Sequence, residues 1–115
     1  MKRTEANLLR DILAAIGAIR RHQPSERDVL GSDELISTLI HKKLEIIGEA
    51  ASRLSAATRA GAPAIPWRDI VGMRNRLVHD YADVDWNVVW SVLHTELEPL
   101  RAQAEAILKE REGHG

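Results

Sequence analysis

The stretch IPWRDIVGMRNRLVHDY, residues 65–81, divides the chain into two helical parts. It contains Arg74, His79 and Tyr81, the only tyrosine, within a few positions of one another. It also opens the most aromatic part of a chain whose other aromatic residues are three tryptophans. The residues before this stretch are typical of scaffold helices, and those after it of a closing helix. We therefore expect the fold to be organised around it.

The bulk composition is that of one globular domain spanning residues 1–115, with a single modest core. The formal net charge of -1 gives no overall footprint for nucleic-acid binding. The absence of cysteine excludes disulfides and thiolate zinc sites, and it suits a reducing cytoplasm. No apolar run approaches the length of a signal-peptide core or a membrane span. We expect a cytoplasmic protein that does not bind membranes.

Apolar residues recur at spacings of three and four, which predicts four main helices. We expect them at about Thr4 to His22, from a cap at Ser32 or Asp33 to near Thr58, from Trp67 to Val78, and from near Trp86 after a cap at Asp83 or Asp85. A short helical turn at residues 25–28 follows Pro24. Strand-like alternation is absent. The fold class is therefore all-α, an up-and-down bundle of four main helices plus a short helical turn.

Prolines and small residues refine this prediction. Pro66 suits the first position of the third helix, and Pro99 should kink the fourth. The second helix has a band of small residues at Gly48, Ala50 and Ala51, which would let another helix cross closely, within one subunit or between two. Its expected inward-facing set is Leu35, Ile36, Leu39, Ile40, Leu44, Ile47, Ala50, Ala51 and Leu54.

The region from Arg53 to His79 is locally basic. It holds five arginines and one acid, Asp69, which gives a local charge of five minus one, or +4. The planar guanidinium fork of arginine suits phosphate groups. A solvated helix face is the alternative interpretation.

Arg74 and His79 are the residue types that RNA cleavage without a metal requires. A histidine near neutral pKa can move protons to and from ribose and leaving-group oxygens, and an arginine can stabilise the phosphoryl charge. On a continuous helix the two positions would lie about 140° apart, so either the helix loosens before His79 or the residues meet across a subunit boundary. A symmetric dimer would supply two histidines, one for each proton transfer.

Neighbouring residues have less specific interpretations. Asn75 could orient Arg74 or cap a backbone group, and Arg76 could contact RNA phosphate or solvent. His79 could instead pair with Asp80 at a helix C-terminus. His41 with Glu45 and His94 with Glu98 have i,i+4 spacing, which is typical of surface salt bridges more often than of metal sites. We predict no metal site and no cofactor.

The ordered set of motifs resembles the HepT-like toxins, minimal members of the HEPN superfamily. That family carries an Arg-x4–6-His motif with a polar residue after the arginine and a tyrosine two positions past the histidine, here Arg74, Asn75, His79 and Tyr81. The flanking blocks also match, at residues 44–51, 65–67 and 84–90, and the resemblance extends over about residues 8–108.

The resemblance implies a metal-independent endoribonuclease that acts as a homodimer, with Arg74 and His79 at the dimer interface. It also implies a type VII-like toxin–antitoxin pair, in which an MNT-type nucleotidyltransferase antitoxin transfers AMP to Tyr81. The alternative is a catalytically silent HEPN binding partner, or the substrate subunit of a nucleotidyltransferase. A plain helical dimerisation module is a third class, against which the intact Arg74, His79 and Tyr81 set argues.

Overall fold

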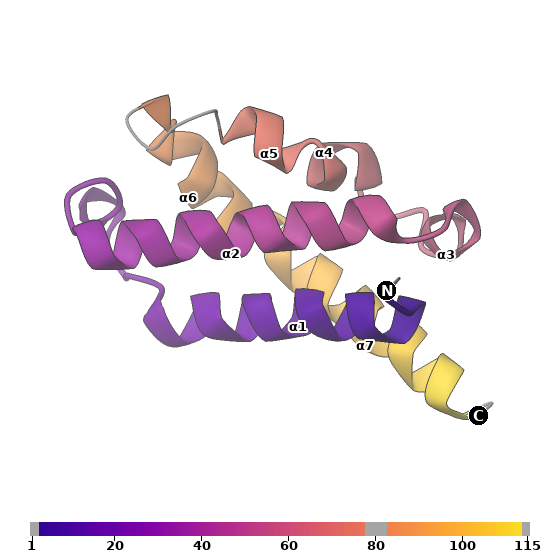
Figure 1. The fold of residues 1–115 in the computed structure, drawn as a ribbon. Helices are drawn as coiled ribbons and strands as arrows, with labels where there is room; N and C mark the ends of the chain where they lie inside the picture. The colour runs from indigo at the N-terminus through magenta and orange to yellow at the C-terminus, as the bar shows by residue number, and fades with distance from the viewer. Residues whose placement is uncertain (1–2, 78–82, 114–115) are drawn as a thin grey trace.

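The computed structural model describes residues 3–77 and 83–113, and it confirms the all-α prediction. Within these ranges the chain forms helices joined by short turns, without a β-strand (Figure 1). The elements are α1 (Glu5–His22), the 3₁₀ turn η1 (Arg27–Val29), α2 (Glu34–Arg53), α3 (Ala56–Ala60), α4 (Trp67–Val71), α5 (Met73–Arg76), α6 (Trp86–Thr95) and α7 (Leu97–Gly113).

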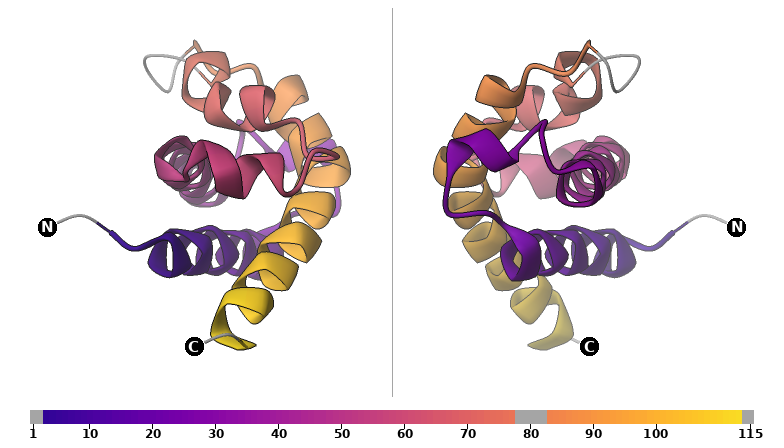
Figure 2. Two further views of the ribbon diagram at one scale, coloured as in Figure 1. Left: turned by 90° about the vertical axis from the view of Figure 1, so that its right-hand side faces the viewer. Right: turned by 90° about the vertical axis from the view of Figure 1, so that its left-hand side faces the viewer.

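Helix α2 is the central element of the bundle. It runs beside α1 on one side, and α4 and α5 pack on its opposite side. The end-on views of Figure 2 show these three layers stacked, with α6 and α7 crossing along one flank of the stack. Helix α7 closes the bundle against α1. The two short helices that precede residues 78–82, α4 and α5, therefore pack on α2.

The core lies between α1, α2, the α4–α5 pair and the α6–α7 flank, and it has the helical periodicity expected from the sequence. Leu35 is the exception, because the structure leaves it 84% exposed at the start of α2 instead of inward. The largest fully buried side chains are Leu9, Ile12, Ile16, Ile19, Ile40, Leu44, Ile47, Ile70, Met73, Leu77, Leu93 and Leu97. None of the described helices has both the length and the apolar character needed to cross a membrane.

Side-chain caps set the helix starts. The oxygens of Thr4, Asp33, Ser55 and Asp85 accept backbone N–H groups in the first turns of α1, α2, α3 and α6. These bonds satisfy donors that have no partner inside a helix. The predicted start of the first helix is confirmed. For the second and fourth predicted helices, where the sequence offered two candidate caps each, the observed caps are Asp33 and Asp85.

The second helix ends at Arg53, so the predicted end near Thr58 is wrong. Leu54 takes an extended backbone, and Ser55 then caps α3 by accepting the N–H of Thr58 at 3.1 Å. A tertiary contact favours this break, because the Ser55 N–H donates to Oε1 of Glu5 at 2.7 Å. A serine that follows an extended residue is a strong N-cap, and the apolar periodicity alone did not reveal it.

The third and fourth helices are each broken in two. Gly72 separates α4 from α5, so the single helix predicted from Trp67 to Val78 is wrong, and Val78 itself lies outside the described residues. Pro66 is the N-cap of α4, one position earlier than predicted. The predicted distortion near Pro99 is confirmed as a break at Glu96. Pro99 has no N–H to donate to the carbonyl of Thr95, and its ring crowds that carbonyl.

Glu5 joins the start of α1 to α3 and α7. Its carboxylate accepts the Ser55 N–H and, at 3.3 Å, the Thr58 hydroxyl, while Arg111 donates to that hydroxyl at 2.7 Å. Partial burial acts to raise the pKa of Glu5, but the hydrogen bonds from Ser55 and Thr58 and the charge of Arg111 outweigh it. The pKa of Glu5 therefore lies below its ordinary value.

We predict that Glu5→Gln lowers the free energy of unfolding by about 1 kcal/mol at pH 7. Because the folded-state pKa is depressed, this stabilisation is present above the unfolded pKa of about 4.3 and is lost as pH falls through the folded value. Urea unfolding at neutral pH and below pH ~4 should show the gap to wild type closing. Glu105→Gln, which removes an exposed partner of Arg101, is the control and should cost less than about 0.5 kcal/mol. A gap that is constant with pH would contradict the prediction.

Candidate functional site

The predicted site surrounds residues 78–82, between α5 and α6. His79, Asp80 and Tyr81 lie outside the described residues, as does the side chain of Arg74, whose backbone belongs to α5. The predicted Arg–His–Tyr constellation therefore stays a prediction. The structure describes the two segments that flank residues 78–82, which are α5 on one side and the start of α6 on the other, together with the charged side chains around them.

The end that precedes the site is fixed by burial. Met73 and Leu77, four positions apart and so on one face of α5, are both fully buried. Upstream, the indole of Trp67 donates to the carbonyl of Ala62 at 3.0 Å and fixes the start of α4. Leu77 is the C-cap of α5, so the helix ends at Arg76, before His79. The helix that carries position 74 therefore ends before His79, and a meeting of Arg74 and His79 across a subunit boundary stays a prediction.

The end that follows the site is fixed by a close contact between Gly31 and Trp86. Gly31 has φ +87°, and a Cβ built there would lie 2.7 Å from Cδ1 of Trp86. The Gly31 N–H donates to Oγ of the fully buried Ser37 at 2.7 Å. Only glycine adopts this backbone at little cost while leaving room for the indole. The first turn of α6 is thus held against the start of α2.

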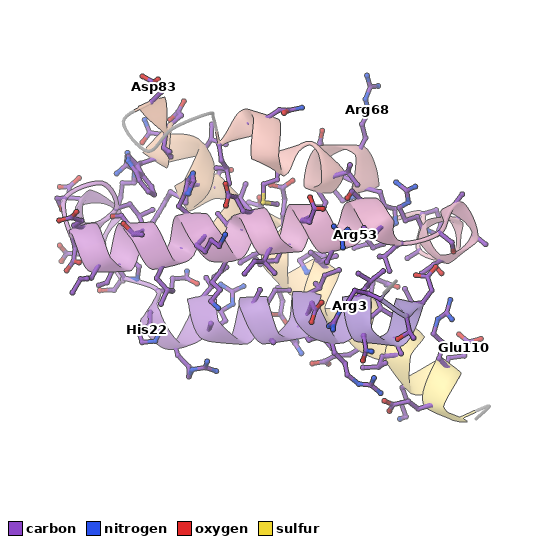
Figure 3. The ribbon with its side chains drawn as sticks, in the orientation of Figure 1. Arg3, His22, Arg53, Arg68, Asp83 and Glu110 are labelled. Carbon is purple, nitrogen blue, oxygen red and sulfur yellow. The ribbon has the colours of Figure 1, made fainter. Side chains whose placement is uncertain are left out.

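Polar contacts reinforce the same end. Nε of Arg27 donates to Oδ1 of Asn87 at 2.8 Å. The Asp85 carboxylate accepts the N–H groups of Asn87 and Val88 at 3.0 and 3.4 Å. Asp83, the other predicted cap, is exposed (Figure 3). Both flanks of residues 78–82 are therefore anchored to α2 or to the turn that precedes it.

The basic segment is less positive in three dimensions than in sequence. Arg53 pairs with Glu49 at 3.0 Å and Arg76 with Glu96 at 3.6 Å. Both acids lie outside the segment that was counted, so the sequence count missed them. Arg68 is exposed and extends away from the bundle on the α4 side (Figure 3). Of the described side chains in the segment, Arg68 is the one best placed to meet a polyanion.

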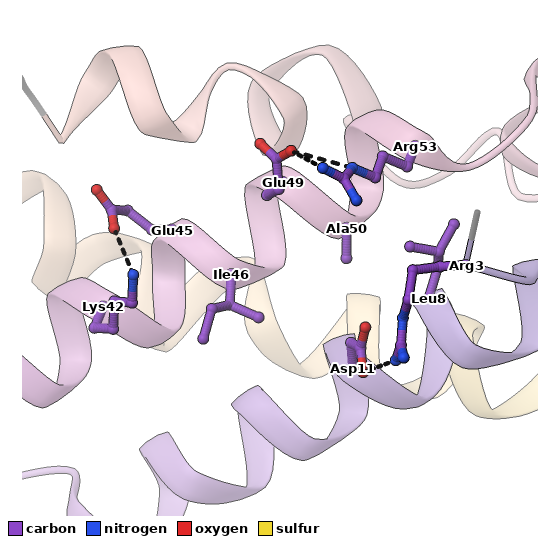
Figure 4. A pocket seen from close by; sticks show the side chains of 9 residues that line it. All are labelled: Arg3, Leu8, Asp11, Lys42, Glu45, Ile46, Glu49, Ala50 and Arg53. Atoms are coloured by element: carbon purple, nitrogen blue, oxygen red, sulfur yellow. Dashed lines mark hydrogen bonds and ion pairs between the residues drawn. The ribbon is translucent and has the colours of Figure 1, made fainter. Parts of the chain in front are cut away.

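A groove of about 410 Å³ lies between α1 and α2 (Figure 4). Its charged lining is balanced, since each cation pairs with an acid of the same wall. This balance makes the groove a poor phosphate site. The pairs are Arg3–Asp11 at 2.6 Å, Lys42–Glu45 at 3.7 Å and Arg53–Glu49 at 3.0 Å.

The histidine–glutamate spacing on α6 and α7 does not form the salt bridge that it predicted. Nδ1 of His94 lies 2.8 Å from the Trp90 carbonyl oxygen, and its ring packs against the Trp90 indole at a tilt of 41°, with centroids 4.1 Å apart. Glu98 pairs instead with Arg101, whose hydrogen bond lowers the pKa of Glu98. Across residues 3–77 and 83–113, no three acids or histidines are grouped closely enough to hold a metal ion.

Comparison with known proteins gives the family. A model of the family described as "Ribonuclease HepT-like" matches residues 12–107. "Probable ribonuclease HepT" of Thermococcus cleftensis is 32% identical over 113 residues, which cover 95% of this chain and 100% of the relative. "Putative RNase TTE0752" of Caldanaerobacter subterraneus subsp. tengcongensis is 34% identical over 77 residues, 67% of this chain and 69% of the relative.

"Putative RNase MJ1216" of Methanocaldococcus jannaschii is 33% identical over 82 residues, 71% of this chain and 68% of the relative. No solved structure matches the chain. The family match covers most of the chain and includes the whole Arg74–Tyr81 stretch. The helical bundle and these similarities agree: the chain belongs to the HepT-like ribonuclease family of the HEPN superfamily.

Proposed function

We propose that this chain is a metal-independent endoribonuclease in which Arg74 and His79 act on the scissile phosphodiester. The observation that carries the proposal is the family match over residues 12–107, which spans the Arg-x4-His motif and the Asn75 and Tyr81 positions on which the sequence resemblance rests. The anchoring of both flanks of residues 78–82 supports it, because a catalytic segment must be held in one geometry. We also propose that residues 1–115 form a single domain and that the protein acts in the cytoplasm.

The chemistry needs two proton transfers and one site of charge stabilisation. The ribose 2′-OH loses its proton to a base and attacks phosphorus, forming a 2′,3′-cyclic phosphate as the bond to the 5′-oxygen breaks. That oxygen takes a proton from an acid. His79 can serve as base or acid near neutral pH, and Arg74 stabilises the phosphoryl oxygens. Asn75 orients Arg74, and Arg76 plays a supporting role.

A composite site at a homodimer interface would complete this set. One chain offers one histidine in the motif, whereas a twofold-symmetric pair offers His79 from each copy. One would act as the base and the other as the acid. On this proposal the monomer is inactive, and cleavage per subunit should fall on dilution below the dimer dissociation constant, as sedimentation and kinetics on the same samples can check.

The motif tyrosine points to regulation by a partner. We propose that an MNT-type nucleotidyltransferase antitoxin transfers AMP to Tyr81, in a type VII-like toxin–antitoxin pair. A phosphate-linked adduct two residues from His79 adds negative charge and bulk where the RNA phosphate must sit, and both oppose substrate binding. Mass spectrometry after incubation with the nucleotidyltransferase and ATP should show AMP on the wild type but not on Tyr81→Phe.

Expression in cells tests the function. Wild-type protein should arrest growth, and His79→Ala and Arg74→Ala should not, at matched protein levels. His94→Ala is the control, because His94 is an exposed histidine of α6 outside the motif. Arrest that survives both motif changes would rule out the nuclease. A folded wild type without AMP that neither arrests growth nor cuts RNA would favour the silent binding partner.

A further inference from the structure

Arg76 and Glu96 form an ion pair that ties α5 to the junction between α6 and α7. Nη1 of Arg76 lies 3.6 Å from Oε1 of Glu96, and the two side chains are 34% and 15% exposed. Among the ion pairs in the described part of the chain, Arg76 is the least exposed cation and Glu96 is the least exposed acid. Water and salt therefore screen this pair less than the others.

Helix α5 needs such a contact because it has only four residues. A helix this short has no stability of its own and takes its orientation from tertiary contacts. Met73 and Leu77 bury one face, but a single apolar stripe leaves α5 able to rotate about its axis. Position 76 is about 100° around the helix from position 77, so its ion pair supplies a contact in a second direction.

Glu96 is well placed to be the fixed partner. It occupies the break between α6 and α7, where its N–H donates to the Val92 carbonyl at 3.0 Å and its carbonyl accepts from Leu100 at 3.2 Å. The next residue, Leu97, is fully buried. The backbone on both sides of Glu96 is therefore held by hydrogen bonds and by burial, and its carboxylate lies against Arg76 of α5.

We propose that Glu96 is a positioning residue for the candidate site: by holding Arg76, it sets the rotation of α5 and hence the direction from which Arg74 meets the phosphate. Positions 74 and 76 lie about 160° apart around a helix, so the anchored flank of α5 is opposite the flank that carries position 74. The predicted effect of Glu96 on catalysis rests on the proposed function, whereas its predicted effect on the orientation of α5 does not. If Arg76 instead contacts RNA phosphate, Glu96 competes with the substrate.

Two variants test the proposal: Glu96→Gln, and the charge reversal Arg76→Glu with Glu96→Arg. The first readout is hydrogen exchange at the amides of Asn75, Arg76 and Leu77, which bond to the Gly72 and Met73 carbonyls at 2.9–3.1 Å. Glu96→Gln should speed their exchange about fivefold with the melting temperature nearly unchanged. Glu45→Gln is the control, because Glu45 pairs with Lys42 at a similar 3.7 Å in the groove between α1 and α2.

The second readout is the kinetics of RNA cleavage. Glu96→Gln should lower kcat about tenfold and leave KM within about twofold, because the arginine is misplaced while binding persists. The charge reversal should restore slow exchange and most of kcat. A purely structural loss would instead lower the melting temperature and the active fraction.

Three results separate the possibilities. Unchanged amide exchange in Glu96→Gln would overturn the proposal. A charge-reversed protein with raised KM, unrestored kcat and weaker salt dependence of RNA binding would also overturn it and assign Arg76 to a phosphate contact. A wild type that does not cut RNA would refute the proposed function alone, since the exchange data still decide whether Glu96 orients α5.

Discussion

His79→Ala is expected to lower kcat/KM for RNA cleavage by about 10²–10⁴-fold, because the proposed mechanism loses its proton-transfer group. Arg74→Ala should cost about 10²–10³-fold by removing stabilisation of the phosphoryl charge. Cleavage of a fluorescent oligoribonucleotide, with circular dichroism of each variant, measures the loss against a folded background.

The control for these variants is His94→Ala, which removes an imidazole that packs at a tilt against Trp90 in the last turn of α6. It should retain nearly all activity. Retention of wild-type activity by folded His79→Ala would remove the histidine from the mechanism, whatever the result for Arg74→Ala.

The largest expected effect on stability is that of Gly31→Ala. Alanine at φ +87° is strained, and its Cβ would approach Cδ1 of Trp86 to 2.7 Å, so the indole must move. The two effects together should lower the free energy of unfolding by about 2–4 kcal/mol. Because Trp86 begins the helix that follows residues 78–82, RNA cleavage should also fall at temperatures where the variant remains folded. Urea unfolding and cleavage assays measure the two effects.

Gly17→Ala is the matched control for this substitution. Gly17 lies inside α1, and a Cβ there would meet only Nη1 of Arg21, at an ordinary 3.5 Å. Alanine is the better helix former, so this variant should gain about 0.5–1 kcal/mol. If Gly31→Ala were as stable as wild type, the contact with Trp86 would not be the anchor described above.

The starts of α1, α2 and α6 were predictable because each of these helices carries an apolar period and a capping residue. For α2 and for α6 the sequence offered two candidate N-cap residues each. Only the folded geometry showed that the caps are Asp33 and Asp85. The breaks at Leu54 and Gly72 were not predicted, because apolar spacing continues across both. The signals were present in Ser55, a preferred N-cap residue, and in Gly72, but either residue is tolerated inside a helix.

In the candidate site, too, some features could be predicted from the sequence and others only from the folded structure. The resemblance to the HepT-like family, together with the residue types, selected Arg74, His79 and Tyr81 as the chemical groups, and that selection remains a prediction. The anchors could not be predicted, because the Gly31–Trp86 and Arg76–Glu96 contacts join residues far apart in sequence. A net charge counted over consecutive residues likewise missed Glu49 and Glu96, which neutralise two of the five arginines in the segment.

The most direct test of the metal-free mechanism is to map the ends of RNA fragments produced by the purified wild-type protein in excess EDTA. Attack by the 2′-OH predicts fragments that end in a 2′,3′-cyclic phosphate, with a 5′-hydroxyl on the following fragment, and no such fragments from His79→Ala. Cleavage that requires an added divalent ion, or that leaves 5′-phosphate ends, would contradict the proposed Arg74–His79 mechanism.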